Sequence, residues 1–229
     1  MLYPGLSAPF VRAFGVRGMA VVPALALVVL VAVVLFTLSR RFGWVAALPV
    51  LVLLATSSDV MFFASAMLTD GLAMMWSALL LFVGLRTYSF RSPAVWLLVA
   101  LTVSLAFTRQ STLIPAGAFL LAWLALAVRR RRLRNRWAPA VLSVCTTALV
   151  AQLLQALLWP GFSQVRQFEL STRTTSLGGA VWHLPRVVLR LAPYELNHLA
   201  QSDLSQLVLL AASVVAGVVL WRRDRPRRL

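Results

Sequence analysis

The 229-residue sequence contains no lysine, one cysteine, two histidines and six acidic residues. Because Cys145 has no possible partner in the chain, an intrachain disulfide and a cysteine metal cluster are both excluded. A Walker-type phosphate loop requires Gly-x-x-x-x-Gly-Lys, and a chain without lysine cannot form one. These absences disfavour an ATPase and a soluble nucleotide-sugar enzyme.

What the sequence does contain is apolar residues and arginine. Hydrophobic residues make up 61% of the chain and charged residues only 12%, with a mean hydropathy of +0.86. A soluble domain of this length needs far more polar surface. The net charge of +16 could suggest nucleic-acid binding, but the arginines fall between apolar stretches, as in cytoplasmic loops. We therefore expect the lipid bilayer as a partner and no nucleic acid.

Seven apolar stretches recur along the chain, and several are about 17 residues long, which is the lower limit for crossing a bilayer. They predict an all-α, polytopic transmembrane helical bundle of about seven spans in the cell membrane. Residues 1–18 are predicted to be a loop, and Pro49 is predicted to kink the second span. The predicted spans cover residues 19–38, 42–58, 69–85, 93–107, 111–128, 137–159 and 204–221.

The chain divides into a membrane core at residues 1–159, a polar segment at 160–203, and a last span with a basic tail at 204–229. The polar segment contains apolar residues at helical spacing, with Arg186 and Arg190 on another face. This pattern predicts an amphipathic helix lying in the membrane interface at the outer face. Its apolar positions are Val181, Leu184, Val188 and Leu191.

The distribution of arginine predicts the orientation of the chain. If the seven spans alternate, fifteen arginines fall on one side of the membrane and seven on the other. The positive-inside rule then places the C-terminus in the cytoplasm and the N-terminus outside. An alternative is that the first span is a signal anchor, with Arg12 and Arg17 inside, which would invert all later loops.

Three ionisable residues lie at the same predicted end of neighbouring apolar spans: Asp59, Asp70 and Arg109. The opposite end carries Arg86 and Arg91. A charge at the centre of a membrane helix costs about 2.5–3.5 kcal/mol, whereas a charge at a helix end avoids most of that cost. The convergence of these residues at the outer face makes that face the candidate site.

Four short motifs, in this order between the predicted spans, resemble the GT-C superfamily of polytopic membrane glycosyltransferases that use polyprenyl-phosphate sugars. Residues 3–5 (Tyr-Pro-Gly), with Pro9, are similar to the end of the family's first extracytoplasmic loop, and residues 40–43 (Arg-Arg-Phe-Gly) to the cytoplasmic turn that follows. Residues 67–70 (Met-Leu-Thr-Asp) resemble the outer Thr-Asp pair that begins a later helix of the family. Residues 105–110 resemble the family's Thr-Arg pair, which follows two membrane crossings later. The resemblance covers about residues 1–136.

The resemblance implies transfer of a sugar from a polyprenyl-phosphate donor to an acceptor at the outer membrane surface. It places Arg109 on the donor phosphate and Asp70 on the acceptor or on a divalent metal, with Asp70 also a candidate base and Asp59 a further substrate-binding candidate. In that family the catalytic aspartate lies early in the first outer loop, just after a first transmembrane helix, and this sequence contains neither. We therefore expect the base upstream of Met1 and the chain to be an N-terminally incomplete enzyme, and the sequence leaves its activity as a fragment open.

Each candidate also has a purely structural interpretation. Asp70 would be a first-turn charge behind a Thr69 cap, Arg109 an interfacial arginine bound to headgroups, and Asp59 a solvated loop acid. Glu195 and His198 stand three residues apart but lack a third ligand, so this pair does not predict a zinc site. No cofactor is assigned from the sequence, and a divalent metal at Asp70 stays open.

Two other functions remain open from sequence. One is a membrane permease or lipid-transporter fragment, which would usually place charged or broken segments at the bilayer midplane. The other is a non-catalytic remnant that only assembles with other membrane proteins. The oligomeric state, the sugar and the acceptor are left open by the sequence.

Overall fold

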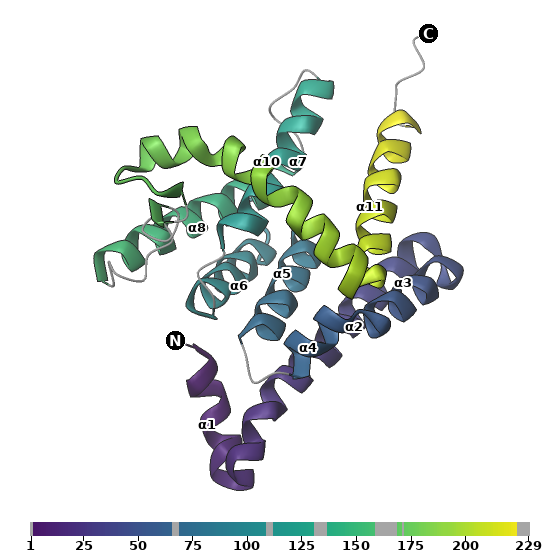
Figure 1. The fold of residues 1–229 in the computed structure, drawn as a ribbon, viewed down its shortest axis with the longest axis vertical. Helices are drawn as coiled ribbons and strands as arrows, with labels where there is room; N and C mark the ends of the chain where they lie inside the picture. The colour runs from purple at the N-terminus through teal and green to yellow at the C-terminus, as the bar shows by residue number, and fades with distance from the viewer. Residues whose placement is uncertain are drawn as a thin grey trace.

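The computed structural model describes residues 2–65, 69–108, 112–130, 137–158, 169–170 and 172–223. These residues form helices and turns, with no strand among them, which confirms the all-α prediction (Figure 1). The principal helices are α1 (Leu2–Phe14), the 3-10 helix η1 (Gly15–Ala20), α2 (Val21–Phe42), α3 (Trp44–Thr56), α4 (Ser58–Ser65), α5 (Asp70–Gly84), α6 (Ala94–Thr108), α7 (Leu113–Arg130), α8 (Ala138–Leu158), α10 (Leu177–Ser202) and α11 (Leu204–Arg223).

The predicted loop at the N-terminus is wrong, because α1 and η1 occupy that part of the chain. The Tyr3 hydroxyl donates a hydrogen bond of 2.8 Å to the carbonyl of Met19, which folds α1 back along η1. A Cβ atom at Gly18 would lie 2.1 Å from the carbonyl oxygen of Phe10, so this close approach requires glycine. Proline is tolerated in the first turn of a helix, and for that reason Pro4 does not prevent α1 from forming.

Most of the second predicted span, at residues 42–58, forms one helix, α3. Gly43 ends α2 with a φ of +80°, a conformation that glycine adopts without strain, and α3 begins at the next residue. Helix α3 continues through Pro49 and ends at Thr56. The short helix α4 then turns the chain towards α5.

Helices α5, α6, α7 and α8 pack around the main buried core. Each of α5 to α8 runs in the opposite direction to the one before it, and α2 lies parallel to α5 on its other side (Figure 1). The packing depends on leucine, valine and alanine side chains that are almost completely buried, which brings the helices into close van der Waals contact. The largest are Leu80, Leu98, Leu105 and Val144.

The helix directions give this group of helices two different ends. We call the end where α2 and α5 finish and α6 and α8 begin the basic end, because it carries Arg40 and Arg86. We call the opposite end the polar end, where α5 starts with Asp70 and α6 finishes with Thr108. The sequence predicted this separation of Asp70 from Arg86.

Among the described residues, two helical stretches are long and apolar enough to cross a membrane: Tyr3–Arg40, which includes α2, and Ala138–Leu158, which is α8. Only 22% and 28% of their most apolar windows are buried by protein, which leaves large apolar faces uncovered. In α8 the side chains of Leu149, Leu153 and Leu157 recur every fourth residue and are each more than half exposed. A face of this kind suits contact with lipid. Because the other apolar helices are shorter, the number of crossings stays a prediction.

The polar segment at residues 160–203 contains the helix that its spacing predicts, α10. The four apolar residues of its predicted lipid face are between 37% and 58% exposed, so the protein does not cover that face. Figure 1 shows α10 passing across the bundle to reach the start of α11 beside α3.

Candidate functional site

The candidate site lies at the polar end, where Asp70 is the first residue of α5. Asp70 is half-buried and its Oδ1 atom is shielded from solvent. Thr69 precedes it in a helical conformation, with φ of −75° and ψ of −8°, and its side chain makes no capping hydrogen bond. Thr69 therefore occupies the N-cap position of α5, as the structural interpretation expects, but its side chain does not cap the helix. A carboxylate in this first turn interacts favourably with the helix dipole.

Thr108, the last residue of α6, is fixed beside α5. The indole Nε1 of Trp76 donates a hydrogen bond of 3.1 Å to the Thr108 hydroxyl, which itself donates to the carbonyl of Ser104 at 2.7 Å. Thr108 is 7% exposed. The residue that follows it is Arg109, which lies outside the described residues. Arg109 therefore directly follows, in the sequence, a threonine that is anchored at the same end as Asp70.

Two glutamines of α8 complete the polar end, and sequence reasoning missed them. The Gln152 side chain donates a hydrogen bond of 2.7 Å to the hydroxyl of Thr112, just before α7, and both residues are buried. The Gln155 side chain donates one of 2.7 Å to the carbonyl of Ala106 in the last turn of α6. The sequence does hold a sign of these contacts. Two amide side chains three residues apart in an apolar helix indicate polar partners on neighbouring helices, because a buried polar group requires a hydrogen-bond partner.

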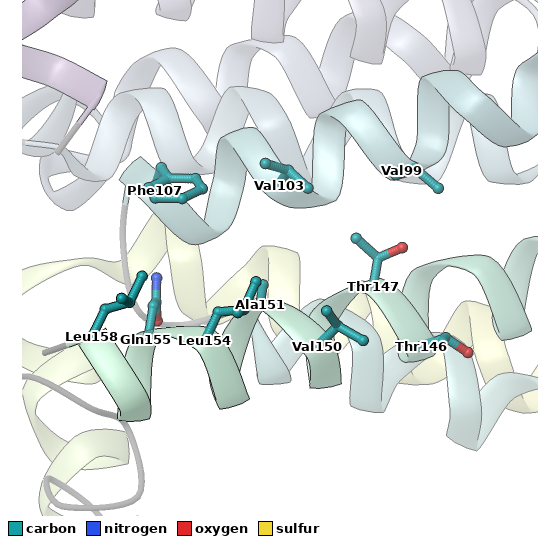
Figure 2. A pocket seen from close by; sticks show the side chains of 10 residues that line it. All are labelled: Val99, Val103, Phe107, Thr146, Thr147, Val150, Ala151, Leu154, Gln155 and Leu158. Atoms are coloured by element: carbon teal, nitrogen blue, oxygen red, sulfur yellow. The ribbon is translucent and has the colours of Figure 1, made fainter. Parts of the chain in front are cut away.

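An apolar groove of about 330 Å³ runs between α6 and α8. Figure 2 shows its two walls, with Val99, Val103 and Phe107 of α6 facing residues of α8. The groove reaches the polar end at Phe107 and Leu158, where Gln155 supplies its amide group. Apolar side chains form most of the remaining wall, which suits a hydrocarbon chain. Its α8 wall consists of Thr146, Thr147, Val150, Ala151, Leu154, Gln155 and Leu158.

A second polar cluster joins the corner between α3 and α4 to the start of α11. The Ser57 hydroxyl donates a hydrogen bond of 2.6 Å to Oδ2 of Asp203, and both residues are nearly inaccessible to solvent. Asp203 Oδ1 accepts a bond of 2.9 Å from the backbone N–H of Gln206, so Asp203 caps α11. The hydroxyls of Thr56 and Ser205 lie 2.9 Å apart in the same corner. We call this cluster the α3–α11 joint, and its role is structural.

The remaining sequence candidates were considered as metal ligands. The described residues contain no group of three His, Cys, Asp or Glu side chains close enough to hold a metal ion. The side chains of Asp59 and Glu195 lie outside the described residues, although their backbones belong to α4 and α10. His198 is exposed on α10.

No protein-family model, no curated protein and no solved structure matches this chain. A functional proposal for this chain therefore rests on the arrangement of the polar end and the adjoining groove.

Proposed function

We propose that this chain belongs to a membrane glycosyltransferase of the GT-C kind, which transfers a sugar from a polyprenyl-phosphate donor to an acceptor. The observation that carries the proposal is the apolar groove between α6 and α8, whose mouth at Phe107 adjoins Thr108. A lipid-linked donor needs a groove for its hydrocarbon chain and a cation for its phosphate at one end of that groove. Arg109, two residues after Phe107 in the sequence, is the cation in this proposal.

In the proposed reaction an acceptor hydroxyl attacks the anomeric carbon of the sugar. The bond from that carbon to the phosphate oxygen breaks, polyprenyl phosphate leaves, and the hydroxyl proton passes to a carboxylate. Arg109 would bind the phosphate through both arms of its guanidinium, which also stabilises the charge that develops on the leaving group. Asp70, the acid at the polar end, is the candidate to bind the acceptor, to contact a divalent metal or to accept the proton.

We infer further that the chain crosses the membrane several times, with its C-terminus and the basic end in the cytoplasm and the polar end outside. Support comes from the helix directions, which place Arg40 and Arg86 together and Asp70 at the far end. Single cysteines at the exposed positions Ser89 and Thr175, in a Cys145→Ser background, test this orientation with a membrane-impermeant thiol reagent. Labelling at Ser89 but not at Thr175 in intact cells would contradict this orientation and indicate the opposite one.

A photoreactive polyprenyl phosphate, with a diazirine in the prenyl chain, tests the groove directly. Val150→Trp places a large side chain in the groove, whereas Leu149→Trp places the same group on the neighbouring exposed face of α8. We expect crosslinking to α6 and α8 to fall at least fivefold in Val150→Trp and to remain within twofold in Leu149→Trp. Equal crosslinking in the two variants would contradict a donor site in this groove.

Arg109 is tested by a change that keeps its charge. Arg109→Lys removes the forked guanidinium, so we expect donor binding to fall about tenfold if Arg109 binds the phosphate through both arms. An arginine that only anchors the chain at the interface can be replaced by lysine, which also extends its charge to the headgroups. Unchanged donor binding would remove Arg109 from the site.

A lipid transporter is the second candidate, because the same groove could carry a lipid without covalent chemistry. Transporters usually place charged residues near the bilayer midplane, whereas Asp70 and Thr108 stand at helix ends. Asp70→Asn separates the two functions in proteoliposomes that contain the chain together with the upstream segment that the sequence analysis predicts. We expect this substitution to reduce sugar transfer, while a transporter would move lipid between leaflets at an unchanged rate.

A further inference from the structure

The basic end holds two arginines against one aromatic pair. The guanidinium carbon of Arg40 lies 5.3 Å from the ring centre of Phe36, and that of Arg86 lies 5.5 Å from the same ring and 4.0 Å from that of Phe82. The two rings meet edge to face at 5.9 Å. Cation–π contacts therefore hold two positive charges on one small surface, although the charges repel each other.

A hollow of about 320 Å³ lies beside these arginines, between the ends of α2 and α5 and the start of α8. Arg40 and Arg86 line it together with Tyr88 and Trp137, whose rings meet edge to face at 5.7 Å. No carboxylate is among the residues that line the hollow. Within the described part of the chain, neither arginine forms an ion pair that would neutralise its charge.

We propose that this hollow binds the phosphate of an anionic phospholipid headgroup. Arginine is suited to phosphate because its planar fork can donate two parallel hydrogen bonds. The hollow lies at the end of apolar helices, and tyrosine and tryptophan are enriched at the depth of lipid headgroups. Basic pockets between membrane helices are known to recognise such headgroups. The site is separate from the polar end and does not depend on the transferase proposed above.

The experiment measures lipid bound to the purified full-length chain in detergent micelles by native mass spectrometry. Phosphatidylglycerol is compared with phosphatidylcholine of the same acyl chains, because only phosphatidylglycerol carries a net negative charge. We expect phosphatidylglycerol to bind at least fivefold more tightly. We expect Arg40→Gln and Arg86→Gln each to weaken its binding at least threefold, and the double variant about tenfold.

Arg91→Gln is the matched control, because Arg91 is exposed in the same loop as Arg86 but does not line the hollow. We expect it to change phosphatidylglycerol binding by less than twofold. Arg86→Lys separates phosphate recognition from general attraction, since lysine keeps the charge and loses the fork; we expect a loss of at least threefold. An effect of Arg91→Gln as large as that of Arg86→Gln, or full binding in Arg86→Lys, would overturn the site.

Free phosphate is distinguished from a lipid headgroup by competition. We expect a millimolar excess of inorganic phosphate to displace less than half of the bound phosphatidylglycerol, because the acyl chains also contribute. Complete displacement, together with equal binding of the two lipids, would show that the ligand is a soluble anion and would overturn the proposal.

Phe36→Leu supplies an independent variant, because it leaves both charges in place and removes the ring that holds them. It should weaken phosphatidylglycerol binding at least threefold.

Discussion

The α5–α8 group and the pair α10–α11 are both helical and apolar, but they are attached to the rest of the molecule in different ways. In α5–α8 the helices meet through large side chains that are almost fully buried, such as Leu80 and Leu98. Helix α11 is instead linked to α3 through the polar α3–α11 joint, where Ser57 meets Asp203. The apolar residues of α10 remain exposed. Packing therefore fixes the first region, and a few hydrogen bonds at one corner position the second.

This difference bears on where a rigid site can be built. The residues that line the apolar groove all come from α6 and α8, which belong to the packed α5–α8 group. A site that binds a lipid-linked donor benefits from such support, because small displacements of catalytic groups reduce rates strongly. Helices α10 and α11 are better placed to cover or adjust a site than to form one.

The largest expected effect is the loss of a core side chain from the packed region. Leu98→Ala removes a side chain with 0% exposure and should lower the free energy of unfolding by about 2–5 kcal/mol. Leu97→Ala is the control, because Leu97 is 49% exposed and should change stability by less than about 0.5 kcal/mol. Unfolding in mixed micelles, followed by circular dichroism, measures both. Similar losses in the two variants would mean that buried packing does not hold α5–α8.

The next effect concerns the α3–α11 joint. Asp203→Ala removes the acceptor for Ser57 and for the N–H of Gln206, which should cost about 1–3 kcal/mol. We expect the loss to appear as faster hydrogen exchange in α11, with exchange in α5–α8 unchanged. Ser213→Ala is the control, since that hydroxyl only bonds within α11. Faster exchange throughout the molecule would show that the two regions are one cooperative unit.

A smaller effect is expected for the polar contact inside the packed region. Gln152→Leu removes the hydrogen bond to Thr112 while keeping a side chain of similar size. Hydrogen bonds between membrane helices contribute about 0.6 kcal/mol on average, and we expect a loss of that order in unfolding free energy. A loss equal to that of Leu98→Ala would contradict the view that apolar packing dominates α5–α8.

The sequence predicted the positions of the helices better than the contacts between them. The apolar stretch at residues 69–85 became α5 (Asp70–Gly84) and that at 93–107 became α6 (Ala94–Thr108), because hydropathy directly marks such segments. The N-terminal helix α1 was missed because Pro4, Gly5 and Pro9 are usually signs of a loop.

The candidate site was predictable only in part. The placement of Asp70 at a helix start follows from the boundary between polar and apolar residues. The pairing of Ser57 with Asp203 joins residues 146 positions apart, and a short polar side chain gives no sign of its distant partner. The groove was not predicted either, since it arises from how α6 and α8 meet rather than from the composition of either helix. Arg109 stays a prediction, because it lies outside the described residues.

The smallest effect on stability is expected on the exposed face of α10. Val188 is 52% exposed, so Val188→Cys should alter unfolding by less than about 0.5 kcal/mol. If α10 lies in the membrane interface, lipid should cover this position although protein does not. In a Cys145→Ser background, a water-soluble thiol reagent should therefore label Val188→Cys at least fivefold more slowly than Arg186→Cys, which lies on the opposite face of the helix. The difference should disappear when the chain is unfolded in denaturant. Equal labelling in the membrane would place both faces of α10 in water, and α10 would then differ from α5–α8 in its surroundings as well as in its attachment.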